Sequence, residues 1–209
     1  MPKLKMPKSS PSLDMTPMVD LAFLLVTFFM LTAQFRPEEV VVVDTPATQS
    51  QSPIPMSNMM TIVVDSTGKV FWDMTDKGIR EAVFVELAKR INYQPTQADL
   101  VKFANIGPVG VPIQQLPRLL ELEAGGDRKV FSEQFEGIPM DSTNNQLRDW
   151  ITITRSIFWN DTGENPIVAL KADGNTNYQR VAEVIRIFQS PGIQISKFKM
   201  ITDLESSRL

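Results

Sequence analysis

An apolar run near the N-terminus constrains this chain more than any other feature. Residues 15–35 read MTPMVDLAFLLVTFFMLTAQF, and Asp20 is the only charged residue among them. The run is close to the ~20 residues that a helix needs to cross a bilayer core. A charged carboxylate inside such a helix costs roughly 2.5–3.5 kcal/mol on insertion scales. Because intramembrane carboxylates usually belong to ion or proton pathways, Asp20 is the first candidate functional residue.

A hydrated carboxylate or a signal peptide would also account for the run. Asp20 lies near its start, which is compatible with hydration at headgroup level, where polar residues cost less. Lys3, Lys5 and Lys8 precede the run as in a signal peptide, although it is long for a signal core and lacks a clear cleavage site. We favour a retained transmembrane helix. Since three lysines precede it and only Arg36 follows closely, the positive-inside rule places the N-terminus in the cytoplasm.

Local signals indicate where this helix begins. Thr16 is a candidate N-cap, because its hydroxyl can accept a hydrogen bond from a backbone N–H in the first turn. Pro17 then occupies the first helical position, where its missing N–H costs nothing. Asp20 follows about one turn inside the helix. We therefore expect a transmembrane helix over residues 15–35, preceded by a short basic tail over residues 1–14.

The helix face that carries Asp20 is otherwise nearly apolar. Thr27 is its one further polar residue and a possible polar neighbour for a partner chain, although a helical threonine also bonds its own i−4 carbonyl. Asp20 therefore has no partner on its own helix, and we expect the partner to come from another chain. The residues that share its face by helical spacing are Phe23, Leu24, Thr27 and Leu31.

Composition excludes several classes of function. The chain has 209 residues and a net charge of −3, and it contains neither cysteine nor histidine. Metal sites and catalysis built on these two residue types are therefore excluded. No basic patch suggests nucleic-acid binding. About 170 residues follow the apolar run, which is enough for one hydrophobic core.

A linker and a small α+β domain are expected after the helix. Residues 36–58 read as a linker because prolines and polar residues interrupt them. Within this linker, Val40, Val41, Val42 and Val43 form a strong β signal, and we expect them to pair with a sheet edge of the same chain or of another. The domain over residues 59–209 begins with a hairpin, whose strands at 60–64 and 69–72 flank a tight turn.

The C-terminal part predicts a βαβ unit. Residues 167–171 and 195–202 read as strands, and residues 178–189 as a helix with apolar residues at helical spacing between them. Phe198 and Met200 are expected on one face of the last strand. Together with the hairpin, this pattern predicts helices packed on a small mixed sheet.

The stretch over residues 74–159 is less regular. Helices are expected near residues 79–91, 96–103, 112–122 and 145–158, and the glycines at 125 and 126 mark a loop. Several charged side chains here and in the hairpin are weak candidates for a site. Four acids could ligate a metal ion, although acids in loops are usually solvated: Asp65, Asp73, Asp76 and Glu81. The charged residues beside Trp150 fit a helix surface better than a binding site; these are Arg148, Asp149 and Arg155.

Two ordered stretches carry a family resemblance. The first runs from residue 14 to residue 21, DMTPMVDL, and leads into the apolar run that ends near residues 29–33. The second includes VALKAD at residues 168–173 and the closing strand at 197–202, with Tyr178, Val181 and Val184 between them. The chain resembles the ExbD/TolR family in both stretches, in the correct order.

The resemblance implies a fold, a location and partners. Proteins of this kind are single-pass proteins of the inner membrane with a periplasmic C-terminal domain. Two copies of the membrane helix sit inside a ring of ExbB/TolQ-like subunits, and a TonB-like protein receives the work in the periplasm. Asp20 matches the proton-carrying carboxylate, Asp14 matches the acidic position before the helix, and Thr16 and Pro17 match the helix entry. The valine run resembles the short periplasmic β segment of the family.

The expected function follows from the resemblance. The chain is predicted to be the proton-channel and force-transducing subunit of a motor that uses the proton-motive force to energise TonB-dependent outer-membrane transport. No enzymatic activity and no cofactor are implied. A TolR-like role in envelope constriction, or a membrane-anchored periplasmic adaptor that conducts nothing, are the alternatives. The stretch over 74–159 departs from the family as an insertion, which we expect to be a surface lobe or an added docking surface.

Overall fold

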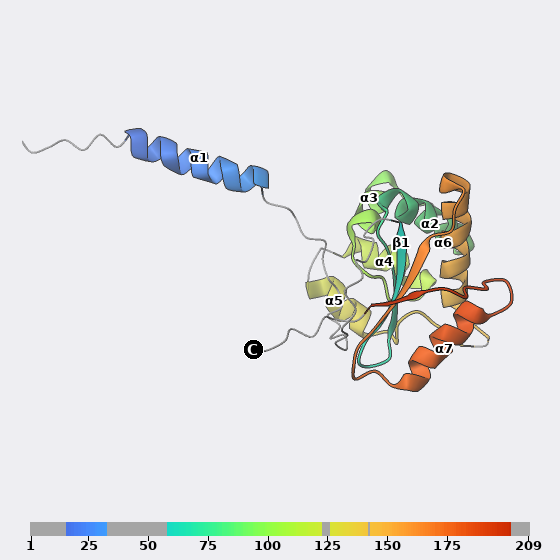
Figure 1. Cartoon of the computed structure of the whole chain (residues 1–209). Coiled ribbons are helices and arrows are strands. Elements are labelled where there is room, and N and C mark those ends of the chain that lie inside the picture. The colour runs from blue at the N-terminus through green and yellow to red at the C-terminus, as the bar shows by residue number, and fades with distance from the viewer. Residues whose placement is uncertain (1–15, 33–57, 123–125, 142, 202–209) are drawn as a thin grey trace, which may run out of the picture. The chain divides into compact units, whose positions relative to one another are not determined.

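The computed structural model describes residues 16–32, 58–122, 126–141 and 143–201. The chain separates into two units, Met1–Arg36 and Pro37–Leu209. The first unit contains helix α1 (Thr16–Thr32). The elements of the second unit are, in chain order, β1 (Met59–Val64), β2 (Val70–Met74), α2 (Lys77–Arg90), α3 (Gln97–Asn105), the 3-10 turn η1 (Ile113–Gln115), α4 (Leu116–Glu121), α5 (Gly126–Glu133), α6 (Gln146–Thr162), β3 (Ile167–Ala172), α7 (Tyr178–Gln189) and β4 (Lys199–Ile201) (Figure 1).

The four strands form one mixed sheet in the order β2-β1-β3-β4. β1 pairs antiparallel with β2 and parallel with β3, and β3 pairs parallel with β4. The hairpin between β1 and β2 closes because the Asp65 carboxylate accepts hydrogen bonds from the backbone N–H groups of Thr67 (2.9 Å) and Lys69 (2.8 Å). Gly68 in this turn has φ +83°, a conformation that L residues avoid. The expected hairpin and βαβ unit are both confirmed.

The core lies between one face of the sheet and the helices. Alternation along β1 places Met60, Ile62 and Val64 on this face, and all three are fully buried. Aromatic rings fill the space above them: the Phe84 and Phe103 ring centroids lie 4.6 Å apart, and those of Trp72 and Trp150 lie 4.8 Å apart. The fold class is therefore α+β, with helices on a small mixed sheet.

The sequence suggested that residues 74–159 form either a surface lobe or an added docking surface. The structure shows no lobe separate from the core in the described part of this stretch. Its buried side chains, including Phe84, Phe103 and Trp150, belong to the same hydrophobic cluster as the sheet residues and the α7 residue Phe188. Helices α2, α3 and α6 thus supply a large part of the main core. The sequence signal for this was the set of large apolar side chains at helical spacing. A solvated lobe would not need to bury a tryptophan fully.

The same stretch covers the outer edge of β2. Trp72 and Val109 exchange two backbone hydrogen bonds of 2.8 Å, and the N–H of Ile138 donates to the Val70 carbonyl at 2.9 Å. These loops occupy backbone groups that an edge strand would leave unpaired. At the opposite side of the sheet, β4 is the edge strand among the described residues.

Three details differ from the sequence prediction. β2 continues to Met74, and β4 is limited to Lys199–Ile201 within the expected strand at 195–202. Phe198 packs against Phe188 and Met200 pairs with Leu170, so both lie on the helix-covered side as expected, but Met200 is 57% exposed at the sheet edge. Helix α5 begins at Gly126. A loop was expected there, because two consecutive glycines normally indicate a turn.

Two glycines provide a matched test of the close approach beside β2. Gly137 has φ +88°, and a Cβ there would lie 2.4 Å from the Val70 backbone nitrogen; Gly163 has φ +75°, and its Cβ would meet nothing within 4 Å. Gly163→Ala should therefore cost about 1 kcal/mol of unfolding free energy through backbone strain alone. Gly137→Ala should cost about 2–4 kcal/mol, because a backbone clash is added. Equal losses in denaturant unfolding would contradict the described packing of Gly137 on β2.

Candidate functional site

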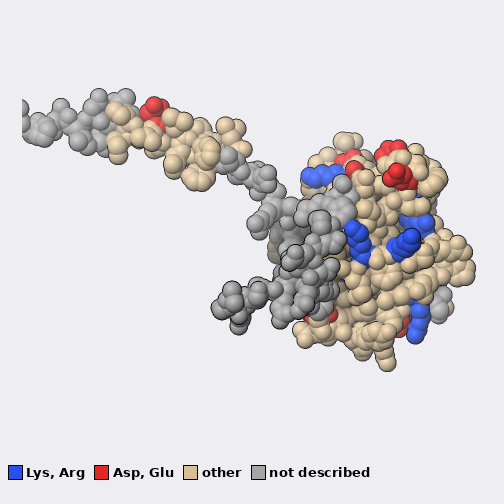
Figure 2. All heavy atoms as spheres, in the orientation of Figure 1, with Lys and Arg blue, Asp and Glu red and all other residues tan. Residues whose placement is uncertain are grey.

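Helix α1 is apolar except for a few polar residues, of which one is charged. Among the described residues of this helix, Asp20 is the only charged side chain, and Figure 2 shows a single acidic group on its otherwise uncharged surface. Large apolar side chains along it are 50–88% exposed, with Leu31 at the upper end. Apolar exposure of this extent along the helix makes α1 suited to burial against other apolar surfaces.

The polar residues of α1 are arranged as the sequence suggested. The Thr27 hydroxyl donates to the carbonyls of Phe23 (2.9 Å) and Leu24 (3.0 Å), which is the local bonding expected of a helical threonine. Thr27 therefore satisfies its donor without Asp20. Asp20 is exposed, and within the part of the chain that the structure describes it lacks a hydrogen-bond or ion-pair partner.

Several predicted site residues cannot be placed. Asp14 and the four valines, Val40 to Val43, lie outside the described residues. Thr16 is the first residue of α1 and Pro17 the second, one position later than the sequence predicted for each. The Thr16 side chain lies outside what is described. Over the described residues, no helix is both long and apolar enough to cross a membrane.

The acids near the hairpin have structural partners rather than a shared ligand. Asp65 holds the β1–β2 turn, and Asp76 caps α2 by accepting from the Ile79 N–H at 2.9 Å. Asp73 forms an ion pair with Arg80. Within the ranges described, no group of three or more acids is placed to hold a metal ion. The four acids singled out in the sequence are therefore not brought together.

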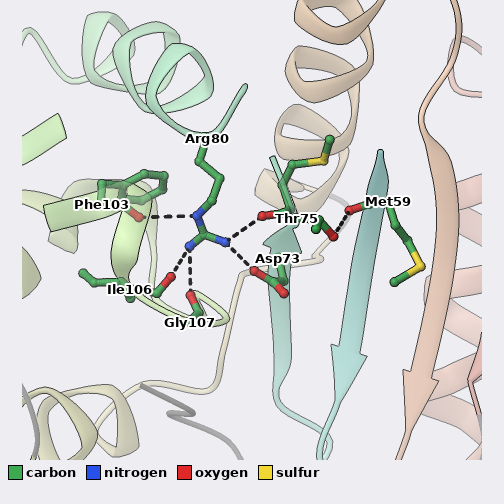
Figure 3. A network of polar contacts seen from close by, with 8 residues as sticks. Met59, Asp73, Thr75, Arg80, Phe103, Ile106 and Gly107 are labelled. Atoms are coloured by element: carbon green, nitrogen blue, oxygen red, sulfur yellow. Dashed lines mark hydrogen bonds and ion pairs between the residues drawn. The ribbon is translucent and has the colours of Figure 1, made fainter. Parts of the chain in front are cut away.

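The buried Arg80 is a key residue that the sequence did not reveal. Its side chain is 3% exposed, and it extends from α2 between β2 and the end of α3 (Figure 3). Its guanidinium donates to the carbonyls of Ile106 (2.6 Å) and Gly107 (2.9 Å), and it lies 5.4 Å from the Trp72 ring centroid. Longer contacts reach the carbonyls of Met74 and Phe103.

The environment of Arg80 balances two opposing effects. Burial lowers the pKa of the Arg80 guanidinium, while the neighbouring Asp73 carboxylate raises it. Arginine retains its proton in proteins even when it is buried, so the side chain stays a cation with planar donors. In the sequence, Arg80 precedes the apolar Ala82 and Val83 and looks like an exposed helix residue. Nothing in the apolar pattern predicts that three backbone segments converge on its guanidinium.

The arginines of α6 contact the loop that follows α7. Arg148 donates to the Pro191 carbonyl at 2.7 Å, and Arg155 donates to the Ile193 carbonyl and to the Asn165 side chain. Asp149 pairs with Arg90 at the end of α2. These side chains join α6 to its neighbours, which agrees with the expectation that they belong to a helix surface.

Comparison with known proteins supports the resemblance drawn from the sequence. A family model described as Biopolymer transport protein ExbD/TolR matches residues 6–202. The chain belongs to the ExbD/TolR family. The match includes α1, both halves of the βαβ unit and the stretch at 74–159 between them. Neither the curated proteins nor the solved structures gave a match.

Membership of the ExbD/TolR family has general consequences. Proteins of this family are anchored in the inner membrane, have periplasmic domains and are not enzymes. They associate with ExbB/TolQ-type partners in a complex and take part in energising biopolymer transport. A helix such as α1, apolar on every side, is suited to burial among partner helices in this setting.

Replacing Arg80 should measure how much the domain depends on it. Arg80→Met keeps the aliphatic stem but leaves the Ile106 and Gly107 carbonyls without their donor and Asp73 without its cation. We expect the unfolding free energy to fall by about 3–5 kcal/mol. The control is Arg186→Met on the exposed side of α7, which should cost about 1 kcal/mol or less. Similar losses in thermal unfolding of the two variants would contradict the role given to Arg80.

Proposed function

We propose that this chain is the proton-channel and force-transducing subunit of an ExbB–ExbD-like motor. In this proposal, Asp20 carries the proton, and the work energises TonB-dependent transport across the outer membrane. The observation that supports it best is the single carboxylate on an apolar helix in a member of the ExbD/TolR family. A charged residue is costly in a membrane helix, so where one occurs it usually serves a function.

The carboxylate provides a two-state element. Ionised Asp20 is most stable beside water or polar groups of the surrounding subunits, whereas protonated Asp20 is compatible with an apolar surface. A change in protonation therefore changes which arrangement of α1 within the ring has the lower free energy. A membrane potential of about 100 mV contributes ~2.3 kcal/mol for one charge that crosses fully, which is enough to bias such stepping.

The proposed topology follows from charge and family. The basic tail over residues 1–14 lies in the cytoplasm, the span over residues 15–35 crosses the inner membrane, and the α+β domain lies in the periplasm. Asp14, Thr16 and Pro17 form the helix entry. The partners are a ring of ExbB/TolQ-like subunits, a second copy of this chain and a TonB-like protein. Val40, Val41, Val42 and Val43 supply a short β segment on the periplasmic side.

Two other roles are consistent with the same family. A TolR-like subunit of an envelope-constriction complex would use the same carboxylate with a different periplasmic partner. A membrane-anchored adaptor would use α1 only as an anchor and would not need an ionisable group at position 20. Asp20 distinguishes the adaptor from both motor roles.

The decisive variant is Asp20→Asn in the native host, with Thr27→Val as the matched control on the same helix face. The amide preserves size and polarity but cannot exchange a proton, so we expect assembly with the ring partner to persist. Uptake driven by the proton-motive force should fall at least tenfold. Thr27→Val removes only a hydroxyl that bonds its own helix, and it should keep near-normal uptake. Normal uptake at normal protein level in Asp20→Asn would establish an adaptor instead.

A chemical measurement complements the genetic one. A hydrophobic carbodiimide modifies protonated carboxyl groups in apolar surroundings, so it should label Asp20 in the assembled complex and leave acids on the domain surface unlabelled. Mass spectrometry of the full chain locates the adduct. Protection of Asp20 by imposing a membrane potential would support proton access through this residue, and absence of the adduct would count against a protonated carboxyl.

A further inference from the structure

A shallow pocket lies on the side of α6 that does not enter the hydrophobic core. Its floor consists of α6 residues at i, i+3, i+4, i+7 and i+8 spacing, which share one side of a helix. Asn165, in the loop before β3, and Gly192, in the loop after α7, complete the lining. The pocket has a volume of about 250 Å³, slightly less than the roughly 300–1,000 Å³ of typical small-molecule sites, so it fits a single-ring ligand. The floor residues are Thr152, Arg155, Ser156, Trp159 and Asn160.

The two loops beside the pocket are held in place by α6. Arg155 donates hydrogen bonds to the Ile193 carbonyl and to the Asn165 side-chain oxygen. Arg148, two turns earlier, donates to a second carbonyl of the loop after α7 at 2.7 Å. In the same loop, Gln194 has φ +50°, a left-handed conformation that is uncommon for non-glycine residues and recurs at binding sites. The walls of the pocket are therefore set by the fold itself.

Trp159 gives the pocket an exposed aromatic surface. This residue is 53% exposed, whereas the other two tryptophans of the chain, Trp72 and Trp150, are fully buried. Tryptophan is highly buried on average, so a half-exposed indole beside a pocket is unusual. The face of an indole is flat and apolar, and it can stack on the C–H groups of a ring-shaped ligand. The pocket therefore has one apolar surface suited to a flat ligand.

The other groups of the pocket are polar and mostly neutral. The Ser156 and Asn160 side chains are exposed, and within the described ranges neither forms a hydrogen bond. The Asn165 oxygen accepts from Arg155 at 3.1 Å, and among the described residues its NH₂ group has no acceptor. Hydroxyl and amide groups both donate and accept hydrogen bonds. These side chains therefore match a ligand whose own groups act in both directions.

The charges at the pocket argue against an ionic ligand. No acidic side chain is among the described residues that line it, so a cation has no counter-ion there. Arg155 supplies a positive charge, but two acceptors already occupy its guanidinium, and an anion would have to compete with both. A sugar ring has the matching neutral chemistry, because it combines C–H groups on one face with hydroxyl groups at its edge.

We propose that this pocket binds the ring of a neutral sugar. The ring stacks on Trp159, and its hydroxyl groups exchange hydrogen bonds with Ser156, Asn160 and Asn165. Arg155 is a positioning residue that keeps the two loops beside the ligand. The site belongs to the α+β domain and goes beyond the transport role proposed for Asp20. The same ring occurs in free sugars and in glycan chains, so the measurement includes both sources.

Saturation-transfer NMR with the full-length chain tests the proposal, because it reports which C–H groups of a ligand touch the protein. The chain is kept in a zwitterionic detergent, since sugar headgroups of other detergents would compete. The neutral probes are glucose and N-acetylglucosamine, and the charged counterparts are protonated glucosamine and glucuronate. We expect saturation transfer to the ring C–H groups of at least one neutral probe, and at least fivefold less to either charged counterpart.

Two variants and a matched control assign the binding to the pocket. Trp159→Ala should reduce the transfer at least fivefold, because it removes the stacking surface. Asn160→Ala should reduce it at least threefold, and both residues are exposed, so the thermal unfolding midpoint should not change. The control is Tyr178→Ala at the start of α7, which removes an aromatic ring that is 79% exposed and outside the pocket lining; it should leave the transfer unchanged.

Three results would overturn the proposal. These are the absence of transfer to either neutral probe, equal transfer in Trp159→Ala and Tyr178→Ala, and stronger transfer to a charged probe, which would assign the pocket to an ion. Sugar binding does not depend on proton transport, so its failure and failure of the Asp20 proposal are separate results.

Oligomers and polymers of the same sugars distinguish the two sources of the ring. Cellotriose and chitotriose are the soluble oligomers, and cellulose and chitin are the insoluble polymers. Binding of the single ring without retention on the polymer would indicate a free sugar. At least tenfold tighter binding of the trimer, together with retention on the polymer, would indicate a glycan chain.

Discussion

The buried guanidinium of Arg80 is the interaction on which the α+β domain depends. It joins the end of β2, the start of α2 and the chain after α3 by donating to backbone carbonyls and pairing with Asp73. Trp72 and Phe103 shield it from water at ring distances of 5.4 and 5.5 Å. Because a buried cation is costly without partners, each of these contacts constrains where its neighbours can lie.

This arrangement explains how the family fold accommodates the stretch at 74–159. Helices α2 and α6 pack side by side on the sheet, and loops from the same stretch pair with the outer edge of β2 through Val109 and Ile138. The stretch therefore covers one face of the sheet and its β2 edge, which would otherwise be exposed to solvent. A partner that adds a strand to this domain would have β4 and not β2 available among the described strands.

Local signals were enough to predict several elements from the amino-acid sequence. The apolar run with Asp20, the turn at Asp65, the amphipathic helix at Tyr178–Gln189 and the parallel unit around it all follow from periodicity, turn chemistry and short-range contacts. The family resemblance added the expected role of Asp20 as a proton carrier.

The role of the middle of the chain emerged from tertiary packing. Arg80 appears in the sequence as an ordinary helix charge, and Gly137 as an ordinary loop glycine, yet one is buried against α3 and the other touches the β2 backbone. Both depend on residues more than 20 positions away. Periodicity reports which face of an element is buried, but not which distant segment covers it, because that choice is made by packing between elements.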